Sequence, residues 1–152
     1  MKKYLLLFAF SAVGLTSCDD EDTQNYELDM LKGSWKTAKV EIISGADKKT
    51  VISTDIPSGC SEKNLTEFRT DYLTSYTSFF PQGNDCGEFK TEGKFSYDAE
   101  TKRLGITYDG DSERTYKIEI LNPTELKLKQ TYDNIDYNGD MIIDQIYISY
   151  KR

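Results

Sequence analysis

The chain has 152 residues, of which 26 are acidic and 19 are basic, and its formal net charge is −7 at pH 7. This acidic balance disfavours nucleic acid as a partner, because phosphate binding needs a basic face. The sequence contains no histidine, so the commonest general base and any Ser-His or Cys-His nucleophile are missing, and we expect no enzyme.

The N-terminus carries two lysines and then an apolar run from Leu5 to Leu15. This run is too short to cross a bilayer, since a spanning helix needs about 20 apolar residues, and it lacks the polar face of an ordinary core helix. Both features favour a secretory signal peptide. The motif Leu15-Thr16-Ser17-Cys18 resembles the lipobox at which bacterial lipoproteins are cut and lipidated on cysteine. The resemblance implies a signal peptide over residues 1–17 and a membrane anchor of acyl chains on Cys18.

Four acidic residues, Asp19 to Asp22, follow the cysteine directly. A block of like charges stays solvated and disordered, so a plain spacer explains it. The block is also similar to the surface-export signal of lipoproteins in the Bacteroidota, although an aspartate after the cysteine means inner-membrane retention in some enteric bacteria. We expect residues 18–25 to form a lipidated acidic tether that holds one domain, residues 26–152, at the outer membrane and on the cell surface.

Beyond the tether, short runs of β-branched and aromatic residues alternate with Gly, Asp and Asn turns, a pattern typical of an all-β domain. Tyr116, Ile118 and Ile120, followed by Leu126 and Leu128, predict a hairpin with one face in water. About eight such strands in sequence order favour an up-and-down antiparallel barrel, which leaves no exposed sheet edge. The other predicted inward residues are Ala38, Val40, Ile42, Phe95, Tyr97, Leu104, Ile106, Tyr108, Ile146, Ile148 and Tyr150.

The middle of the chain is ambiguous between helix and strand. Tyr72, Tyr76 and Phe79 could share one helical face, but the serines and threonines between them favour a strand, which we expect. Leu65 and Phe68 belong to the strand before it and are out of phase by one residue, which predicts a β-bulge.

Two cysteines, Cys60 and Cys86, remain after the predicted processing site. In an oxidising compartment such a pair is more often a disulfide than two free thiols, and metal binding without histidine is weak by comparison. We expect a disulfide between them.

The motif Gly33-Ser34-Trp35, directly before the first predicted strand, resembles the Gly-x-Trp signature of lipocalins and of the lipocalin-like lipoproteins of the Bacteroidota. The resemblance implies an eight-stranded barrel whose base is closed by a short helical turn, formed here by Tyr26, Leu28 and Leu31. It also implies that Trp35 stacks on a basic residue near the chain end, here Arg152, as a structural contact. Another small β-barrel or sandwich is the alternative fold.

Two features depart from the pattern of that family. Trp35 is out of phase with Ala38, and the segment from Phe80 to Gly87 reads as a long loop. Either departure would alter the mouth of a cavity.

A possible calcium loop lies near the C-terminus. Asp136, Asn138, Asp140 and Asp144 have a spacing that resembles acidic calcium-binding loops, since calcium takes six or more oxygen ligands. Asn138-Gly139 is also the strongest short signal for a hairpin turn, and turn chemistry accounts for the same residues without a metal. We favour the plain hairpin and expect no other cofactor.

Two classes of function fit these features. The first is a binding module that holds a small apolar or amphipathic ligand in the barrel, lined by Tyr and Phe. The second is a solid-core barrel that meets a protein or glycan on the cell surface, because eight strands can also be packed full. Tyr132, Tyr137 and Tyr147 are the outward candidates for that surface.

Overall fold

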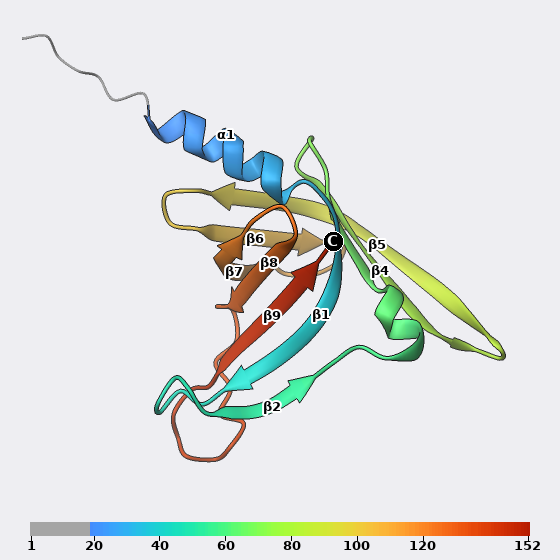
Figure 1. The fold of residues 1–152 in the computed structure, drawn as a ribbon, viewed down its shortest axis with the longest axis vertical. Helices are drawn as coiled ribbons and strands as arrows, with labels where there is room; N and C mark the ends of the chain where they lie inside the picture. The colour runs from blue at the N-terminus through green and yellow to red at the C-terminus, as the bar shows by residue number, and fades with distance from the viewer. Residues whose placement is uncertain (1–18) are drawn as a thin grey trace, which may run out of the picture.

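The computed structural model describes residues 19–152, so the predicted signal peptide and Cys18 lie outside the described residues. Within that range, no helix is long and apolar enough to cross a membrane. The elements, in chain order (Figure 1), are α1 (Asp19–Leu31), β1 (Gly33–Ile43), β2 (Val51–Asp55), the 3-10 helix η1 (Gly59–Lys63), β3 (Leu65–Phe68), β4 (Leu73–Gln82), β5 (Asp85–Asp98), β6 (Arg103–Tyr108), β7 (Arg114–Leu121), β8 (Glu125–Gln130) and β9 (Gln145–Lys151).

The strands form a closed antiparallel barrel. From β3 to β9 each strand pairs with the next, and β9 returns to pair with β1. The opposite edge of β1 is shared by two short strands, with β3 paired along Gly33–Lys36 and β2 along Val40–Ile43. These two strands together occupy one position, so the barrel has eight positions and the predicted up-and-down fold is confirmed.

The barrel wall is interrupted between β2 and β4. In residues 19–152, β2 pairs only with β1, while β4 continues past the end of β3 towards Gln82. Residues 56–64, which we call the strap, cross this gap and contain η1. The predicted disulfide is present, and it joins Cys60 of the strap to Cys86 of β5 with a Cα–Cα distance of 5.6 Å. In Figure 1, a loop leads from the end of β2 to η1, which lies beside β4, and the β4–β5 hairpin extends beyond the barrel.

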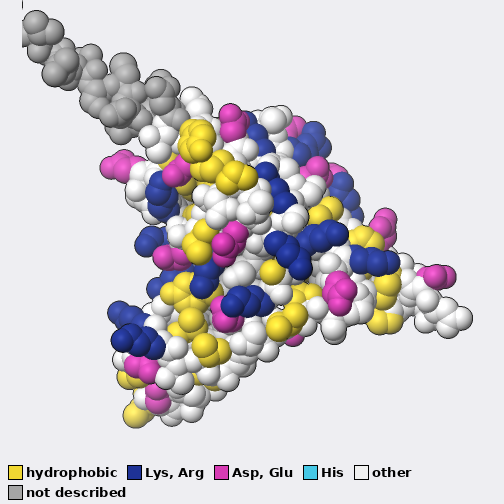
Figure 2. All heavy atoms as spheres, in the orientation of Figure 1, with side chains coloured by type: hydrophobic (Ala, Val, Ile, Leu, Met, Phe, Trp, Pro, Cys, Tyr) yellow, Lys and Arg dark blue, Asp and Glu magenta, His cyan; other side chains and the backbone are white. Residues whose placement is uncertain are grey.

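The outer face carries charges of both signs. Lys90 lies 3.4 Å from Glu92, and Lys117 lies 3.4 Å from Glu119, each pair with exposed side chains. Figure 2 shows basic and acidic side chains interspersed over the face that carries β8 and β9. Such exposed pairs contribute little to stability. Because the two signs are mixed, this face is solvated without carrying an electrostatic potential of one sign.

A bulge in β1 explains the phase of Trp35. In the β1–β9 pairing, Thr37 faces Tyr150 and Lys39 faces Ser149, so Ala38 is the extra residue. An extra residue reverses the alternation beyond it. Trp35 and Val40 therefore both face the interior, and the apparent departure from the family pattern disappears.

The bulge predicted around Leu65 and Phe68 is wrong. Strand β3 pairs regularly on both sides, and its buried residues are Thr66 and Phe68, with Leu65 on the other face. The inward positions of β3 are Thr66 and Phe68, and a threonine at the first of them gives no apolar signal in the sequence. A bulge lies instead in β7, where the register shifts between Ile118 and Ile120 and leaves Ile120 37% exposed.

The middle segment is a strand, as predicted, and it is longer than expected. Pairing between β4 and β5 continues through Phe80 with Gly87 to Gln82 with Asp85. The long loop predicted over Phe80–Gly87 is therefore wrong. Gly83 has φ +64°, which lets a two-residue turn join the strands directly.

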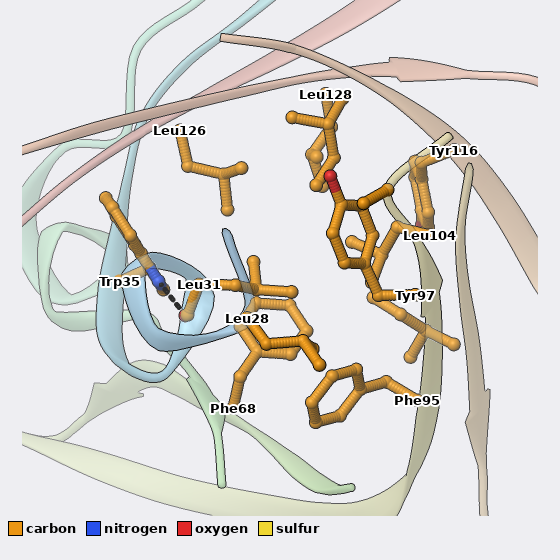
Figure 3. Close-up of a cluster of buried hydrophobic side chains, with 13 residues drawn as sticks. Leu28, Leu31, Trp35, Phe68, Phe95, Tyr97, Leu104, Tyr116, Leu126 and Leu128 are labelled. Atoms are coloured by element: carbon orange, nitrogen blue, oxygen red, sulfur yellow. Dashed lines mark hydrogen bonds between the residues drawn. The ribbon is translucent and has the colours of Figure 1, made fainter. Parts of the chain in front are cut away.

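Helix α1 closes one end of the barrel. Leu28 and Leu31 are buried, and Figure 3 shows them lying among Trp35, Phe68 and Phe95. We call this end the base. The remaining buried residues of its hydrophobic core are Tyr97, Ala99, Leu104, Ile106, Tyr116, Ile118, Leu126 and Leu128.

The helix is longer than the turn that the resemblance implied. It begins at Asp19, so the acidic residues expected in a disordered spacer are helical. Gln24, expected in the tether, donates to the backbone oxygen of Tyr97 at 2.7 Å and accepts from the amide of Ala99 at 2.8 Å. Tyr26 is 66% exposed and takes no part in closing the base. The boundary predicted after residue 25 therefore falls inside a helix that is already attached to the barrel.

Candidate binding cavity

The barrel interior is packed at the base and hollow at the other end. Several strands run from core residues to cavity residues, as β7 does from Ile118 through Tyr116 to Arg114. The hollow end holds a cavity of about 410 Å³. Ligand pockets in proteins are usually some 300–1,000 Å³, so the space suits a small molecule. This geometry favours the hollow barrel over the solid one.

Tyrosine side chains form much of the cavity wall. The rings of Tyr76 and Tyr108 lie 6.5 Å apart between centroids, and those of Tyr116 and Tyr132 meet edge to face at 5.5 Å. Tyr132 was expected on the outer surface, but it follows β8 and lines the cavity against Tyr116. The five cavity tyrosines are Tyr76, Tyr108, Tyr116, Tyr132 and Tyr150.

Burial makes the phenol groups harder to ionise. It raises the pKa of Tyr108 to about 12, and it raises the pKa of Tyr150 and Tyr116 well above the usual value. Neighbouring phenols of Tyr132 and Tyr150 raise the pKa of Tyr116 further. At neutral pH the wall therefore presents uncharged hydroxyls, each able to donate one hydrogen bond and to accept others.

Two of the residues that line the cavity are charged, Arg114 and Asp55. Arg114 Nη2 donates to Asp111 Oδ2 at 2.8 Å, and both side chains are nearly half exposed. Asp55 is the last residue of β2, the strand that borders the gap. The aliphatic part of the lining comes mainly from Val40, Ile106 and Ile148.

The strap forms one side of the cavity. Ile56, Pro57, Ser58, Ser61 and Asn64 all contribute to the lining. Asn64 Oδ1 accepts a hydrogen bond from the amide of Phe79 at 2.7 Å, which attaches the strap to β4 beside the Cys60–Cys86 disulfide. Ile56 is 66% exposed and presents an apolar side chain at the opening. Sequence reasoning missed this wall, although Pro57 and Gly59 indicate a break in the strand pattern.

The signature residues meet at the base and do not line the cavity. The guanidinium of Arg152 lies 4.2 Å from the ring centroid of Trp35, the contact that the resemblance implied. Trp35 Nε1 donates to the backbone oxygen of Leu31 at 2.8 Å, and Arg152 donates to the backbone oxygens of Met30 and Lys32. Gly33 has φ +109°, a backbone conformation that side chains disfavour. These residues are structural.

The carboxylates of the acidic segment accept hydrogen bonds mainly from backbone amides of the same loop. Asp136 accepts hydrogen bonds from the backbone amides of residues 138–141, and Asp144 is buried and accepts from the amides of Gly45 and Tyr137. Asp140 accepts from Asn138 and from the amide of Ile142. The carboxylates are thus directed to the backbone.

The plain hairpin predicted for this segment is wrong, because residues 131–144 form a long connection between β8 and β9. The Asn138-Gly139 turn lies within that connection instead of joining the strands. Among the described residues, no group of three or more Asp, Glu, Cys or His side chains is arranged to hold a metal ion. Calcium at Asp136, Asn138, Asp140 and Asp144 stays a prediction.

The remaining outward tyrosines are ordinary surface residues. Tyr137 is 45% exposed, and Tyr147 lies under the ammonium groups of Lys127 and Lys129, which are 4.9 and 5.9 Å from its ring centroid. Single exposed tyrosines of this kind need no binding partner to explain them.

Comparison with known proteins gives one family match and several similar folds. A family model described as a lipocalin-like domain matches residues 31–128. The bovine lipocalin allergen Bos d 2 is 14% identical, with 82% of this chain and 74% of that chain covered and a TM-score of 0.43.

Two further solved structures are similar. A deswapped triple mutant of bovine odorant-binding protein is 14% identical, with 81% and 74% of the two chains covered and a TM-score of 0.40. The possum milk whey lipocalin trichosurin, with bound 4-ethylphenol, is 11% identical, with 80% and 75% covered and a TM-score of 0.39. No curated protein matches the chain in sequence.

Proposed function

Since the chain belongs to the lipocalin-like domain family, we propose that it binds a small amphipathic molecule in the hollow end of its barrel. The observation that carries this proposal is the cavity of about 410 Å³, which mixes aromatic and aliphatic walls with a few polar groups. Such a combination is typical of sites for small organic ligands. The proposal concerns binding and not catalysis.

The test is to fill the cavity. Val40 lines the cavity, whereas Thr107 lies on the outer face of β6. Val40→Trp and Thr107→Trp add the same side chain on opposite sides of the wall. We expect Val40→Trp to weaken binding of the fluorescent probe 8-anilinonaphthalene-1-sulfonate at least tenfold, while Thr107→Trp leaves it within twofold of the unmodified protein. Equal binding by all three proteins would place the site elsewhere.

We further propose that the protein is anchored to the outer membrane through acyl chains on Cys18 and faces the cell surface. The support is the motif Leu15-Thr16-Ser17-Cys18 and the acidic residues after it. Helix α1 leaves the base of the barrel (Figure 1), so an anchor before Asp19 would be attached at the end opposite the cavity. The anchor would then leave the cavity accessible.

Metabolic labelling with palmitate tests the anchor. We expect the label on the unmodified protein and none on Cys18→Ala, and digestion of the unmodified protein by protease added to intact cells. Label on Cys18→Ala would exclude this cysteine as the acylation site. Protection from protease until the cells are broken would exclude the surface location.

A further inference from the structure

The cavity has a positively charged group next to its neutral phenols, and this arrangement selects among amphipathic ligands. We propose that the ligand carries a carboxylate, which Arg114 binds together with the hydroxyls of Tyr108 and Tyr116. This inference rests on the proposed function and adds the chemistry of the ligand's polar end.

The three side chains share one region of the wall. Arg114 and Tyr116 are two residues apart on β7, so both point to the same side of the sheet, and both line the cavity. Tyr108 lies at the end of β6, the strand next to β7, where Ile106 pairs with Arg114. The positive charge of Arg114 acts on both phenols and lowers the pKa of each against the larger effect of burial. The three side chains therefore line one region of the cavity wall.

Arg114 retains hydrogen-bonding capacity towards the cavity. A guanidinium has five N–H donors, and within residues 19–152 Arg114 engages one of them, on Nη2, in the bond to Asp111. A carboxylate is matched by Nε paired with Nη2 or by Nη1 paired with Nη2. Each pair uses a different proton of Nη2, so one of the two pairs stays available beside the bond to Asp111. Lysine would offer only a point charge at this position.

The cavity wall around Arg114 is rich in hydrogen-bond donors. Arg114 can only donate, and the hydroxyls of Tyr108 and Tyr116 are protonated at neutral pH, so each can donate one hydrogen bond. On the acceptor side, Asn64 Oδ1 is already engaged by the amide of Phe79, and Asp55 belongs to β2, four of the eight strand positions away from β7. A ligand group that only accepts hydrogen bonds complements this region.

When a ligand fills the cavity, its polar group has to replace the hydrogen bonds that water made to Arg114. A bound molecule displaces water from the inner side of the guanidinium, and a charged group that loses water without gaining a partner destabilises the complex. A carboxylate replaces the lost hydrogen bonds with charge-assisted ones. An alcohol replaces few of them, and an ammonium group is repelled. The aliphatic side chains of Ile106 and Ile148 remain available for the apolar body of the ligand.

The experiment compares three probes that differ only at the polar end: decanoate, decan-1-ol and decylamine. Calorimetric titration measures the affinity of each for the unmodified protein. We expect decanoate to bind at least tenfold more tightly than decan-1-ol, and decylamine to bind most weakly. Arg114→Gln should remove the preference for decanoate while leaving decan-1-ol within twofold, which also shows that this variant is folded. Arg114→Lys should keep part of the preference.

Arg103→Gln is the matched control. Arg103 is an arginine on the neighbouring strand, it is ion-paired with Glu113 at 2.8 Å, and it does not line the cavity. We expect Arg103→Gln to leave the affinities for decanoate and for decan-1-ol unchanged. Equal affinity of the unmodified protein for decanoate and decan-1-ol, or preference for decylamine, would overturn the carboxylate and leave the cavity function standing. Failure of all three probes would also overturn it, and failure of the fluorescent probe as well would overturn both proposals.

Discussion

At the scale of single residues, Trp35 joins three parts of the chain. It is fully buried, it donates a hydrogen bond to the end of α1, and the guanidinium of Arg152 stacks on its ring. Arg152 in turn donates to the backbone at Met30 and Lys32, where the C-terminal carbonyls of a helix need partners. One aromatic residue thus fixes the helix, the first strand and the last residue against each other.

We therefore expect Trp35→Ala to be strongly destabilising. Removing a fully buried aromatic side chain costs about 3–5 kcal/mol through lost transfer free energy and the cavity left behind. Phe89→Ala is the control, because Phe89 is 65% exposed and should change the free energy of unfolding by no more than about 0.5 kcal/mol. Urea unfolding measures both. A loss below about 1 kcal/mol for Trp35→Ala would show that the base does not depend on this contact.

At the scale of elements, the strap differs from every other part of the cavity wall. The strands are held by continuous backbone pairing, whereas residues 56–64 are attached to β4 and β5 by the Asn64 hydrogen bond and the Cys60–Cys86 disulfide. Segments with few backbone hydrogen bonds open locally at low free energy. The disulfide is therefore the main restraint on this side of the cavity.

The double variant Cys60→Ser, Cys86→Ser tests that role. With a sequence separation of 26 between the cysteines, the chain-entropy model gives a loss of about 3.5 kcal/mol in the free energy of unfolding. Amide hydrogen exchange should also become faster in residues 56–64, while α1 and the base strands change only with global stability. Exchange in the strap that rises no more than exchange at the base would show that other contacts hold it.

The strand content was predictable from alternation, but its irregularities were not. The apolar residues of β6 and β9 repeat every second position, and the structure places them inward as expected. Alternation fails at Ala38 and Ile120, because a bulge is a pairing property of two strands and only one of them is read at a time. It also fails at Thr66, where a polar residue occupies an inward position beside the cavity.

The candidate site was predictable only in its general character. Tyrosine content indicated an aromatic lining, and four of the five cavity tyrosines lie on strands that the sequence predicted. Tyr132 was misplaced because it lies beyond the end of β8, where no strand period applies. Arg114 was missed because one arginine at a strand start is a common surface residue, and only the barrel closure turns it towards the phenols.

At the scale of the whole molecule, the barrel has a packed end and a hollow end, and the hollow end makes stability depend on alkaline pH. Below pH 10 the phenols are protonated in both the folded and the unfolded state. As pH rises from 10, the unfolded chain releases phenol protons, while Tyr108 keeps its proton because burial raises its pKa to about 12. The unfolded state then binds fewer protons, so the free energy of unfolding falls through this window.

Urea unfolding at several values between pH 9 and 11.5 measures this dependence. We expect the free energy of unfolding to fall less steeply for Tyr108→Phe than for the unmodified protein, because one proton-linked group has been removed. Tyr26→Phe, at a tyrosine that is 66% exposed, should keep the original slope. The idea fails if Tyr108→Phe and the unmodified protein have the same slope over this range.

The interrupted wall has a consequence for how such a protein can change over evolutionary time. Substitutions or insertions in residues 56–64 leave the barrel pairing and the base intact, since neither depends on this segment. The same segment supplies a side of the cavity. Ligand preference can therefore diverge by exchange of a nine-residue segment, while the eight-position scaffold that carries it stays the same.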